Sequence, residues 1–295
     1  MKTEWIWMNG DVMPMGEASI SVEDRGFQFA DGVYEVVRLY GGIPFTLAEH
    51  LARLGRSAAG VQISLPMPAE ALAEEILGFL PRVGISDGMV YLQLTRGAAP
   101  RNHLFPKGVA ATLLFYCRAL DPAPEPGTAD GLNLLSVPDE RWKRCWVKSI
   151  ALLPNVLAKN QAIAAGADEA VFVDDGIVTE CSTSNVFSVI DGALVTHPTG
   201  PKVLPGVTRD VLIRCAREIG IEVEERPWTD AEARRASEVF ITSTTREVSW
   251  VKAWDGRTIG AACGDITLNI HREYQKQVTR ETGGVNKTPE LASGR

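Results

Sequence analysis

Short segments of regular hydrophobic spacing follow one another from the start of the chain. Val33–Leu39 is rich in β-branched residues and partly alternates between apolar and polar, which predicts a strand. Apolar residues then recur at helical spacing over Leu47–Ala58 and stop at Gly60, which predicts a helix. Thr46 and Glu49 have the spacing of a capping box, so we expect that helix to begin with one.

The pattern of expected elements divides the chain near its middle. A second helix is expected over Pro68–Leu80, and strands over Met89–Thr95 and Ala110–Cys117. The segment 121–131 then carries proline at three alternate positions and ends in glycine, which disfavours both helix and sheet. We therefore predict a small N-terminal domain over residues 1–120, a linker over 121–131 and a large domain over 132–282.

The second part mixes strands and helices without strict alternation. A capping box is expected at Thr229–Glu232, and residues 283–295 form an unpatterned polar stretch that we expect to be a flexible tail. Strands and helices in this irregular order favour an α+β fold over a doubly wound one. The expected elements are helices over Asn155–Ala165, Thr208–Ile219 and Ile266–Glu281, and strands over Glu169–Val173, Val186–Ile190, Glu238–Thr242 and Val248–Val251, with a further strand near Val195.

Composition and charge narrow the class of protein. The 295 residues are 45% hydrophobic and 23% charged, as in globular proteins, and the net charge of −7 without a long basic stretch disfavours nucleic acid and anionic membranes as partners. No apolar run is long enough for a signal peptide or a membrane span. Five scattered cysteines and four histidines form no metal-binding or disulfide pattern, so we expect a cytoplasmic protein without a metal site.

Lys148 and Glu180 are the first candidates for chemistry. Lys148 lies in the largely apolar stretch 145–153, where burial would lower the pKa of its amine and make it a Schiff-base nucleophile. A lysine at a strand end with its amine in solvent would have the same surroundings in the sequence. Glu180 precedes an apolar strand, and a half-buried carboxylate there needs a cationic partner. A pyridinium nitrogen or an arginine would serve equally.

Several other segments could bind anions. Leu204–Asp210 opens a helix in which Gly206 permits close approach and Thr208 can cap, so its free N–H groups could bind a phosphate or simply belong to a capped helix. The small hydroxyls of Ser243–Thr245 suit a phosphate or a turn. Arg101–His103, in a loop rich in Pro and Gly, could bind a carboxylate or remain a solvated basic loop.

Together these features are what a pyridoxal phosphate enzyme needs, and the chain resembles the fold-type IV (class IV) pyridoxal-phosphate aminotransferases, within them the D-amino-acid aminotransferases. The resemblance runs from about Trp7 to Thr282. It implies a two-domain α+β fold with a smaller N-terminal lobe and a larger β-barrel-like C-terminal lobe. The motifs that carry it are Glu23–Val36, Glu49–Leu54, Thr95–Gly97, Lys148–Ser149, Thr179–Glu180, Ser184–Phe187, Pro205–Arg209 and Thr242–Thr245.

The resemblance assigns roles to residues of this chain. It implies that Lys148 binds the cofactor covalently and moves the proton, and that Glu180 pairs with the ring nitrogen. It places Arg141 near the cofactor's phenolic oxygen. The whole cofactor-binding set that it implies is Lys148, Arg53, Glu180, Arg141, Thr183, Leu204, Val207, Thr208, Ser243 and Thr244.

The resemblance also implies a substrate class. Tyr34, Arg101 and His103 match the carboxylate trap of the D-amino-acid branch, and Val36 is expected beside them. The resemblance therefore implies transfer of an amino group from a D-amino acid, such as D-alanine or D-glutamate, to 2-oxoglutarate or pyruvate by a ping-pong mechanism. It also implies a homodimer. The alternatives on the same fold are a branched-chain L-amino-acid or (R)-amine transaminase and an aminodeoxychorismate lyase. A non-catalytic binding protein is the alternative of another class.

Overall fold

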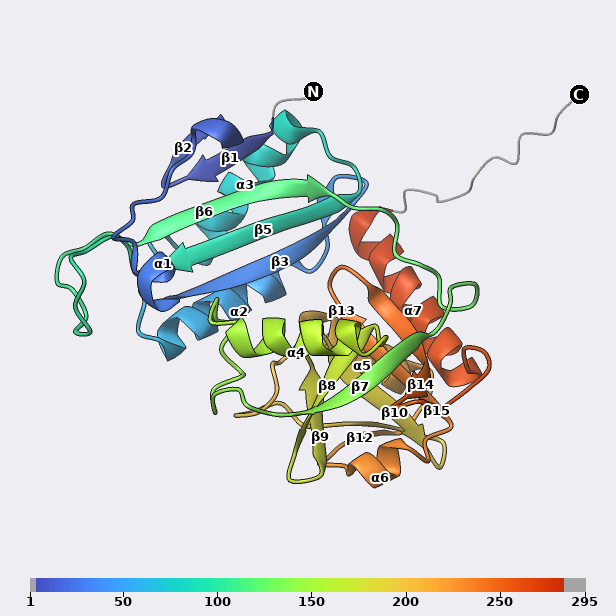
Figure 1. Ribbon diagram of the computed structural model, residues 1–295. Coiled ribbons are helices and arrows are strands. Elements are labelled where there is room, and N and C mark those ends of the chain that lie inside the picture. Colours follow the sequence, from blue (N-terminus) through green and yellow to red (C-terminus); the bar gives the residue numbers. More distant parts are fainter. Residues whose placement is uncertain (1–3, 284–295) are drawn as a thin grey trace, which may run out of the picture.

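The computed structural model describes residues 4–283, which form two β-sheets, each with its own helices (Figure 1). We call the parts built on them the small lobe, residues 4–119, and the large lobe, residues 132–283. The mixture of sheet and helix confirms the expected α+β fold. Within the described part of the chain, no helix is long and apolar enough to span a membrane.

The small lobe contains a six-stranded sheet in the order β2-β1-β6-β5-β3-β4, with every neighbouring pair antiparallel. The first two strands were not expected from the sequence, whereas β3 and β5 contain the segments that were. The strands are β1 (Trp5–Met8), β2 (Asp11–Pro14), β3 (Gly32–Tyr40), β4 (Ile43–Pro44), β5 (Gly88–Thr95) and β6 (Thr112–Ala119).

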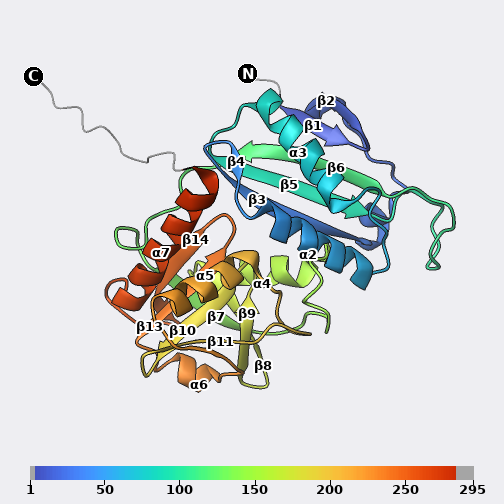
Figure 2. The same cartoon turned by 180° about the vertical axis from the view of Figure 1, so that it is seen from behind.

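Helices α2 (Leu47–Gly60) and α3 (Ala69–Val83) cover one face of this sheet (Figure 2). The apolar side chains that repeat at helical spacing on α2, such as the fully buried Leu54, pack with Leu92 and Phe115 of the strands. Their burial removes apolar surface from water and joins the helices to the sheet. Two short helices precede this layer: the 3-10 helix η1 (Met15–Glu17) and α1 (Arg25–Phe29).

One of the two expected capping boxes forms. Thr229 accepts from the N–H of Glu232, and the Glu232 side chain accepts from the N–H of Thr229, at the start of α6 (Asp230–Ala233). The expectation for Thr46 was wrong. Its φ of 54° is left-handed, and its hydroxyl donates to the carbonyl of Phe45, so the side chain does not reach the first turn of α2.

The large lobe contains a nine-stranded sheet in the order β12-β11-β10-β13-β14-β7-β8-β9, with β15 beside β14. The sheet curls, so that its two end strands come close together. Ile177 of β9, at one end of the strand order, forms a bridge with Thr229, which follows β12 at the other end. The strands are β7 (Leu132–Pro138), β8 (Glu169–Asp174), β9 (Ile177–Cys181), β10 (Asn185–Ile190), β11 (Ala193–Thr196), β12 (Val223–Glu225), β13 (Glu238–Ser243), β14 (Glu247–Trp254) and β15 (Arg257–Thr258).

Three longer helices complete the large lobe: α4 (Leu153–Ala164), α5 (Val207–Glu218) and α7 (Asp265–Thr282). The core between α5, α7 and the sheet also takes in Tyr40 and Phe45 of the small lobe, which pack against Tyr274. The expected domain boundaries at 120, 131 and 282 stay a prediction. The expected tail over 283–295 lies outside the described residues except for Gly283, which ends α7.

The segment between β7 and α4 positions the site. It leaves the large sheet, runs along the small lobe and returns to the large lobe in α4. Along the way the N–H of Ile150 donates to the carbonyl of Gly32 at 3.1 Å, and Ser149 bridges to Val33 of β3. This segment therefore carries the residues around Lys148 into the space between the two sheets.

Candidate active site

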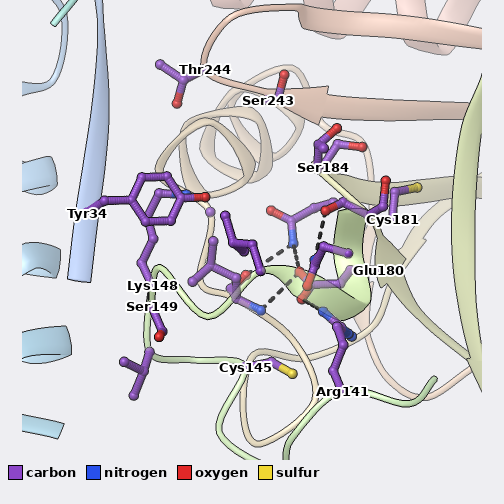
Figure 3. A pocket seen from close by; sticks show the side chains of 18 of the residues that line it. Tyr34, Arg141, Cys145, Lys148, Ser149, Glu180, Cys181, Ser184, Ser243 and Thr244 are labelled. Atoms are coloured by element: carbon purple, nitrogen blue, oxygen red, sulfur yellow. Dashed lines mark hydrogen bonds and ion pairs between the residues drawn. The ribbon is translucent and has the colours of Figure 1, made fainter. Parts of the chain in front are cut away.

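A cavity of about 330 Å³ lies between the two lobes, within the size range of small-molecule sites. Tyr34 of β3 and Arg53 of α2 line it from the small lobe. The large lobe supplies Glu180 of β9 and the end of β13, and the segment before α4 supplies Lys148. Residues far apart in the sequence therefore meet at one concave site (Figure 3).

The backbone of Lys148 is held from two directions. Its N–H donates to the Ser57 hydroxyl at 3.0 Å, and its carbonyl accepts from the N–H of Tyr34, also at 3.0 Å. Its amine lies 4.3 Å from the centre of the Tyr34 ring, inside the cavity (Figure 3). The fixed backbone limits where the amine can reach, so this lysine is placed to react with a molecule bound in the cavity.

Glu180 lies across the cavity from Lys148, at the end of β9 (Figure 3). One of its oxygens accepts from Arg141 Nη1, and the other accepts from Asn185 Nδ2 at 3.1 Å and from the N–H of Leu204 at 3.0 Å. Burial raises the pKa of Glu180 above its ordinary value, although Arg141 opposes this. A carboxylate in these surroundings has a high affinity for a proton or a cation that enters the cavity.

Arg141 has a second carboxylate partner, Asp139. Its Nε donates to Asp139 Oδ1 at 2.9 Å and its Nη2 donates to Asp139 Oδ2 at 2.8 Å. Nη2 also donates to the carbonyl of Lys202 at 2.9 Å. The resemblance expects this arginine near a phenolic oxygen of the cofactor. The structure shows that its guanidinium already binds two carboxylates.

The start of α5 provides backbone donors on another side of the cavity. Gly206, Val207 and Thr208 line it there, and the first N–H groups of a helix have no acceptor within the helix. A Cβ atom on Gly206 would lie 2.1 Å from Asn185 Oδ1, so glycine is needed for this close approach. Gly206 is the N-cap and no side chain caps the helix, so Thr208 does not have the capping role that its position suggested. The start of α5 therefore faces the cavity in the way that helix N-termini face bound anions.

Arg53 brings a positive charge to the same side. Its Nε and Nη2 donate to the two oxygens of Glu35 at 2.7 and 2.8 Å, and its Nη1 donates to the carbonyl of Pro205 at 2.9 Å. His50 Nδ1 lies 2.8 Å from Glu35 Oε2. Burial alone would raise the pKa of Glu35, but Arg53 and His50 lower it to about 2. The arginine is therefore anchored before any ligand enters.

Two buried hydroxyls of the cavity wall have no hydrogen-bond partner among the described residues: Ser184 Oγ and Thr242 Oγ1. Buried polar atoms are usually paired, so these two indicate that a polar ligand completes the site. The cavity thus combines an amine, a buried carboxylate, a helix N-terminus beside an arginine, and unpaired hydroxyls. These groups fit pyridoxal phosphate, which carries an aldehyde, a ring nitrogen and a phosphate.

The structure brings together every residue of the expected cofactor-binding set. Tyr34 of the expected substrate-binding set also lines the cavity, whereas Val36 does not, although it lies on the same face of β3. Arg101 and His103 lie outside the cavity of their own chain, in the exposed loop between β5 and β6 that projects from the small lobe (Figure 1). The Arg101 guanidinium lies 4.3 Å from the centre of the Phe29 ring.

Sequence reasoning missed several residues of the site. Glu35, His50 and Asn185 all fall inside the recognised motifs, yet none received a role from pattern alone. Glu35 could have been found, because a carboxylate in a largely apolar strand needs a buried partner. Asp139 carried no signal, since the strand that it follows, β7, was not expected from the sequence.

Residues 32–254 match the model of the family described as amino-transferase class IV. The chain is 41% identical over 278 residues to the D-alanine aminotransferase of Bacillus licheniformis, covering 94% of this chain and 98% of that one. It is 37% identical over 275 residues to the D-alanine aminotransferase of Staphylococcus haemolyticus, covering 92% and 97%.

Solved structures share the fold at lower identity. The branched-chain amino acid aminotransferase of Escherichia coli superposes with a TM-score of 0.88 at 25% identity, over 95% of this chain and 96% of that chain. The branched-chain aminotransferase of the thermophilic archaeon Thermoproteus uzoniensis, solved with norvaline, gives 0.82 at 26% identity, over 97% of each chain. The family match, the relatives and the fold agree, and the chain belongs to the class IV aminotransferases.

Proposed function

We propose that this protein transfers the amino group of a D-amino acid, such as D-alanine or D-glutamate, to a 2-oxo acid, 2-oxoglutarate or pyruvate, by a ping-pong mechanism. The observation that carries the proposal is the cavity with the Lys148 amine and the Glu180 carboxylate on its opposite sides. The relatives that are 41% and 37% identical over more than nine-tenths of this chain are named D-alanine aminotransferases, which supports the substrate class.

Class IV aminotransferases as a family use pyridoxal 5'-phosphate, and the cavity has a group for each part of it. We propose that Arg53, the first N–H groups of α5 and the hydroxyls of Ser243 and Thr244 hold the phosphate. Glu180 would face the ring nitrogen, and Leu204 and Thr183 would contact the ring. Arg141 would act on the cofactor through Glu180, to which it donates.

The chain's own groups divide the proton chemistry. When bound, pyridoxal phosphate supplies an electron sink for the negative charge left at Cα after a proton is removed. Lys148 would bind the cofactor and, once displaced by the substrate amine, take the proton from Cα as a general base. Glu180 would hold a proton at the ring nitrogen, which its burial beside the cavity favours.

The position of Arg101 and His103 supports the expectation of a homodimer. Both residues are exposed and lie outside their own cavity, so we propose that they serve the carboxylate trap of a second copy. The same loop exposes Leu104 by 75% and Phe105 by 51%. Helix α4 exposes a further apolar stripe, formed by Leu153, Val156, Leu157 and Ile163. Exposed apolar side chains grouped in this way are typical of a protein interface.

We also propose that the protein works in the cytoplasm. All five cysteines are free thiols, four of them buried. Unpaired thiols are typical of a reducing compartment.

Replacement of the lysine tests the proposed reaction. Lys148→Ala is expected to abolish turnover and the reducible yellow colour of the protein with pyridoxal phosphate. Lys159→Ala removes a lysine outside the cavity, on α4, and is expected to keep the colour. Normal turnover by Lys148→Ala would overturn the proposed role of this residue.

A branched-chain L-amino-acid transaminase is the second candidate, because the solved structures that share the fold include branched-chain aminotransferases. An (R)-amine transaminase or an aminodeoxychorismate lyase remains a further alternative on this fold. Initial rates over a panel of D- and L-amino acids and (R)-amines with one 2-oxo acid, followed by chiral analysis of the product, separate these activities. Faster turnover of L-leucine than of D-alanine would contradict our proposal.

The dimer has its own test. Sedimentation is expected to give twice the chain mass of 32.0 kDa. Arg101→Ala is expected to raise KM for D-alanine by an amount that matches one charge-assisted contact, ~1.5–3 kcal/mol, with little change in kcat. Lys107→Ala, in the same exposed loop, is the matched control and is expected to leave KM unchanged. An active monomer would overturn the proposed homodimer.

A further inference from the structure

Asp139 belongs to a chain of three charges that ends at the cavity. Arg141 lies between Asp139 and Glu180, and the exposed fractions of the Asp139, Arg141 and Glu180 side chains are only 6%, 5% and 7%. Glu180 lines the cavity, but Asp139 does not. Asp139 therefore acts on a bound molecule from outside the cavity, through its contact with Arg141 and through its charge beside Glu180.

The hydrogen bonds of Asp139 fix the direction of the guanidinium. Asp139 accepts from Nε and Nη2 of Arg141 at 2.9 and 2.8 Å, and from the Thr179 hydroxyl at 3.0 Å. Two parallel bonds of this kind define the plane of the arginine group. Only Nη1 is then left to reach Glu180. Asp139 itself is anchored, because its N–H donates to the carbonyl of Val173 on β8.

The charges of this group have a consequence for the cavity. An arginine paired with Glu180 alone would cancel its negative charge and weaken its hold on a positive group in the cavity. With Asp139 present, the three side chains carry two negative charges and one positive charge. One negative charge therefore remains in a buried place. Arg141 and Glu180 both line the cavity, and Glu180 is the carboxylate of the group that does so.

The neighbouring titratable groups leave this balance unchanged. The thiols of Cys145 and Cys181 also line the cavity near Glu180. Burial raises the pKa of Cys145 to about 11 and that of Cys181 well above its ordinary value, so both are neutral at neutral pH. Lys202 is exposed and paired with Asp174, and only its carbonyl accepts from Arg141.

We propose that Asp139 is a positioning residue: by binding two donors of Arg141 and balancing its charge, it leaves Glu180 negative enough to hold a proton on the ring nitrogen of the cofactor. This inference rests on the proposed function, because it takes pyridoxal phosphate as the ligand. Asp139 touches neither the cofactor nor the substrate, so its effect is on proton affinity at the ring nitrogen and not on the binding of either molecule.

The test uses the holoenzyme with a cofactor that carries an NMR-active isotope at its ring nitrogen. In the wild type, the chemical shift is expected to be that of a protonated pyridine. In Asp139→Asn, which removes the charge at nearly constant shape, the shift is expected to move toward that of an unprotonated one. The kcat is expected to fall by about 10- to 100-fold, as for partners one step removed from a reactive group, with KM nearly unchanged.

Two variants separate charge from structure. Asp174→Asn removes a carboxylate from the neighbouring strand β8, outside the cavity, and is expected to leave both the shift and kcat as in the wild type. Asp139→Glu keeps the charge and is expected to retain the protonated shift. Should Asp139→Asn fail to fold, as seen by circular dichroism, Asp139→Ser, with a hydroxyl in place of the charge, carries the same expectation.

The outcomes decide between the inference and the proposed function. A protonated ring nitrogen in a folded Asp139→Asn or Asp139→Ser holoenzyme would overturn the role of Asp139. The role of Asp139 would also be overturned if the ring nitrogen lost its proton as fully in Asp139→Glu as in Asp139→Asn, because the charge at position 139 would then not be the cause. If the wild type binds no pyridoxal phosphate, or keeps its cofactor linkage in Lys148→Ala, the proposed function itself fails.

Discussion

Glu35 and Glu180 are buried carboxylates that each bind an arginine, and their surroundings differ. Glu35 in the small lobe receives two hydrogen bonds from one arginine, Arg53, and its pKa falls to about 2 despite burial. Glu180 in the large lobe receives one hydrogen bond from Arg141, and the same arginine also donates to Asp139. Burial raises the pKa of Glu180. The same pair of residue types is thus an anchor in one lobe and a reactive group in the other.

The difference comes from how the arginine is shared. Among the described residues, Arg53 donates to no carboxylate other than Glu35, and it gives Glu35 a matched countercharge in a fork geometry. Arg141 gives most of its donors to Asp139 and to a backbone carbonyl. Burial disfavours a charge that is only partly balanced, so Glu180 keeps an affinity for a proton that Glu35 has lost.

The largest effect is expected for Glu180→Gln. An amide cannot carry the negative charge that faces the cavity, so kcat should fall about a thousandfold, equal to ~4 kcal/mol in the barrier. The free energy of unfolding should change little or rise, because a buried charge is removed. Steady-state kinetics and urea unfolding measure the two quantities. A kcat within a few-fold of the wild type would remove Glu180 from the chemistry.

Glu35→Gln should act on stability instead. The change leaves Arg53 buried without its countercharge, and breaking such a pair lowers the free energy of unfolding by about 3 kcal/mol or more. Urea unfolding of the protein without added cofactor measures this directly. An unfolding free energy equal to that of the wild type would show that the comparison between the two carboxylates is wrong.

A fall in pH should change the contributions of Glu35 and Glu180 to the free energy of unfolding in opposite directions. Glu35 has a lowered pKa in the folded protein, so its contribution to stability is present above pH 4.5 and is lost as the pH falls toward about 2. Glu180 has a raised pKa, so its contribution is present below its unfolded value and is lost as the pH rises through the folded value. Urea unfolding of the wild type should weaken toward pH 2, and Glu35→Gln should show a shallower slope than Glu180→Gln.

The smallest effect is expected for His50→Leu. The change removes the hydrogen bond between the imidazole and Glu35 while Arg53 keeps both of its own. The loss of one such bond should lower the free energy of unfolding by about 1 kcal/mol. Thermal unfolding would detect it. A loss as large as that of Glu35→Gln would mean that His50, and not Arg53, holds the carboxylate.

Much of this site could be predicted along the chain. Lys148 and Glu180 stand out because an amine in an apolar stretch and a carboxylate before an apolar strand need special surroundings. Gly206 before an amphipathic helix suggested a close approach, in a phosphate site or in an ordinary capped helix, and the approach that the structure shows is that of the Asn185 side chain. Local chemistry of this kind is readable because one residue and its neighbours suffice to state it.

Other features depended on contacts between distant residues. Thr46 and Thr229 have the same capping pattern, yet only Thr229 caps, because the chain enters α2 through a left-handed residue. Arg101 and His103 match a motif, but the loop that carries them leads away from their own cavity. Strand β7, after which Asp139 lies, was not expected at all, so its link to Arg141 could not be seen.

The sequence by itself determined the α+β class, most helices, the strands with clear alternation and the residue types that can hold pyridoxal phosphate. Those features follow from spacing and side-chain chemistry, which are local. Only the tertiary structure decided which carboxylate became an anchor and which stayed reactive. That choice depends on burial and on how Arg53 and Arg141 divide their donors, and both are set by residues that meet only when the two lobes fold together.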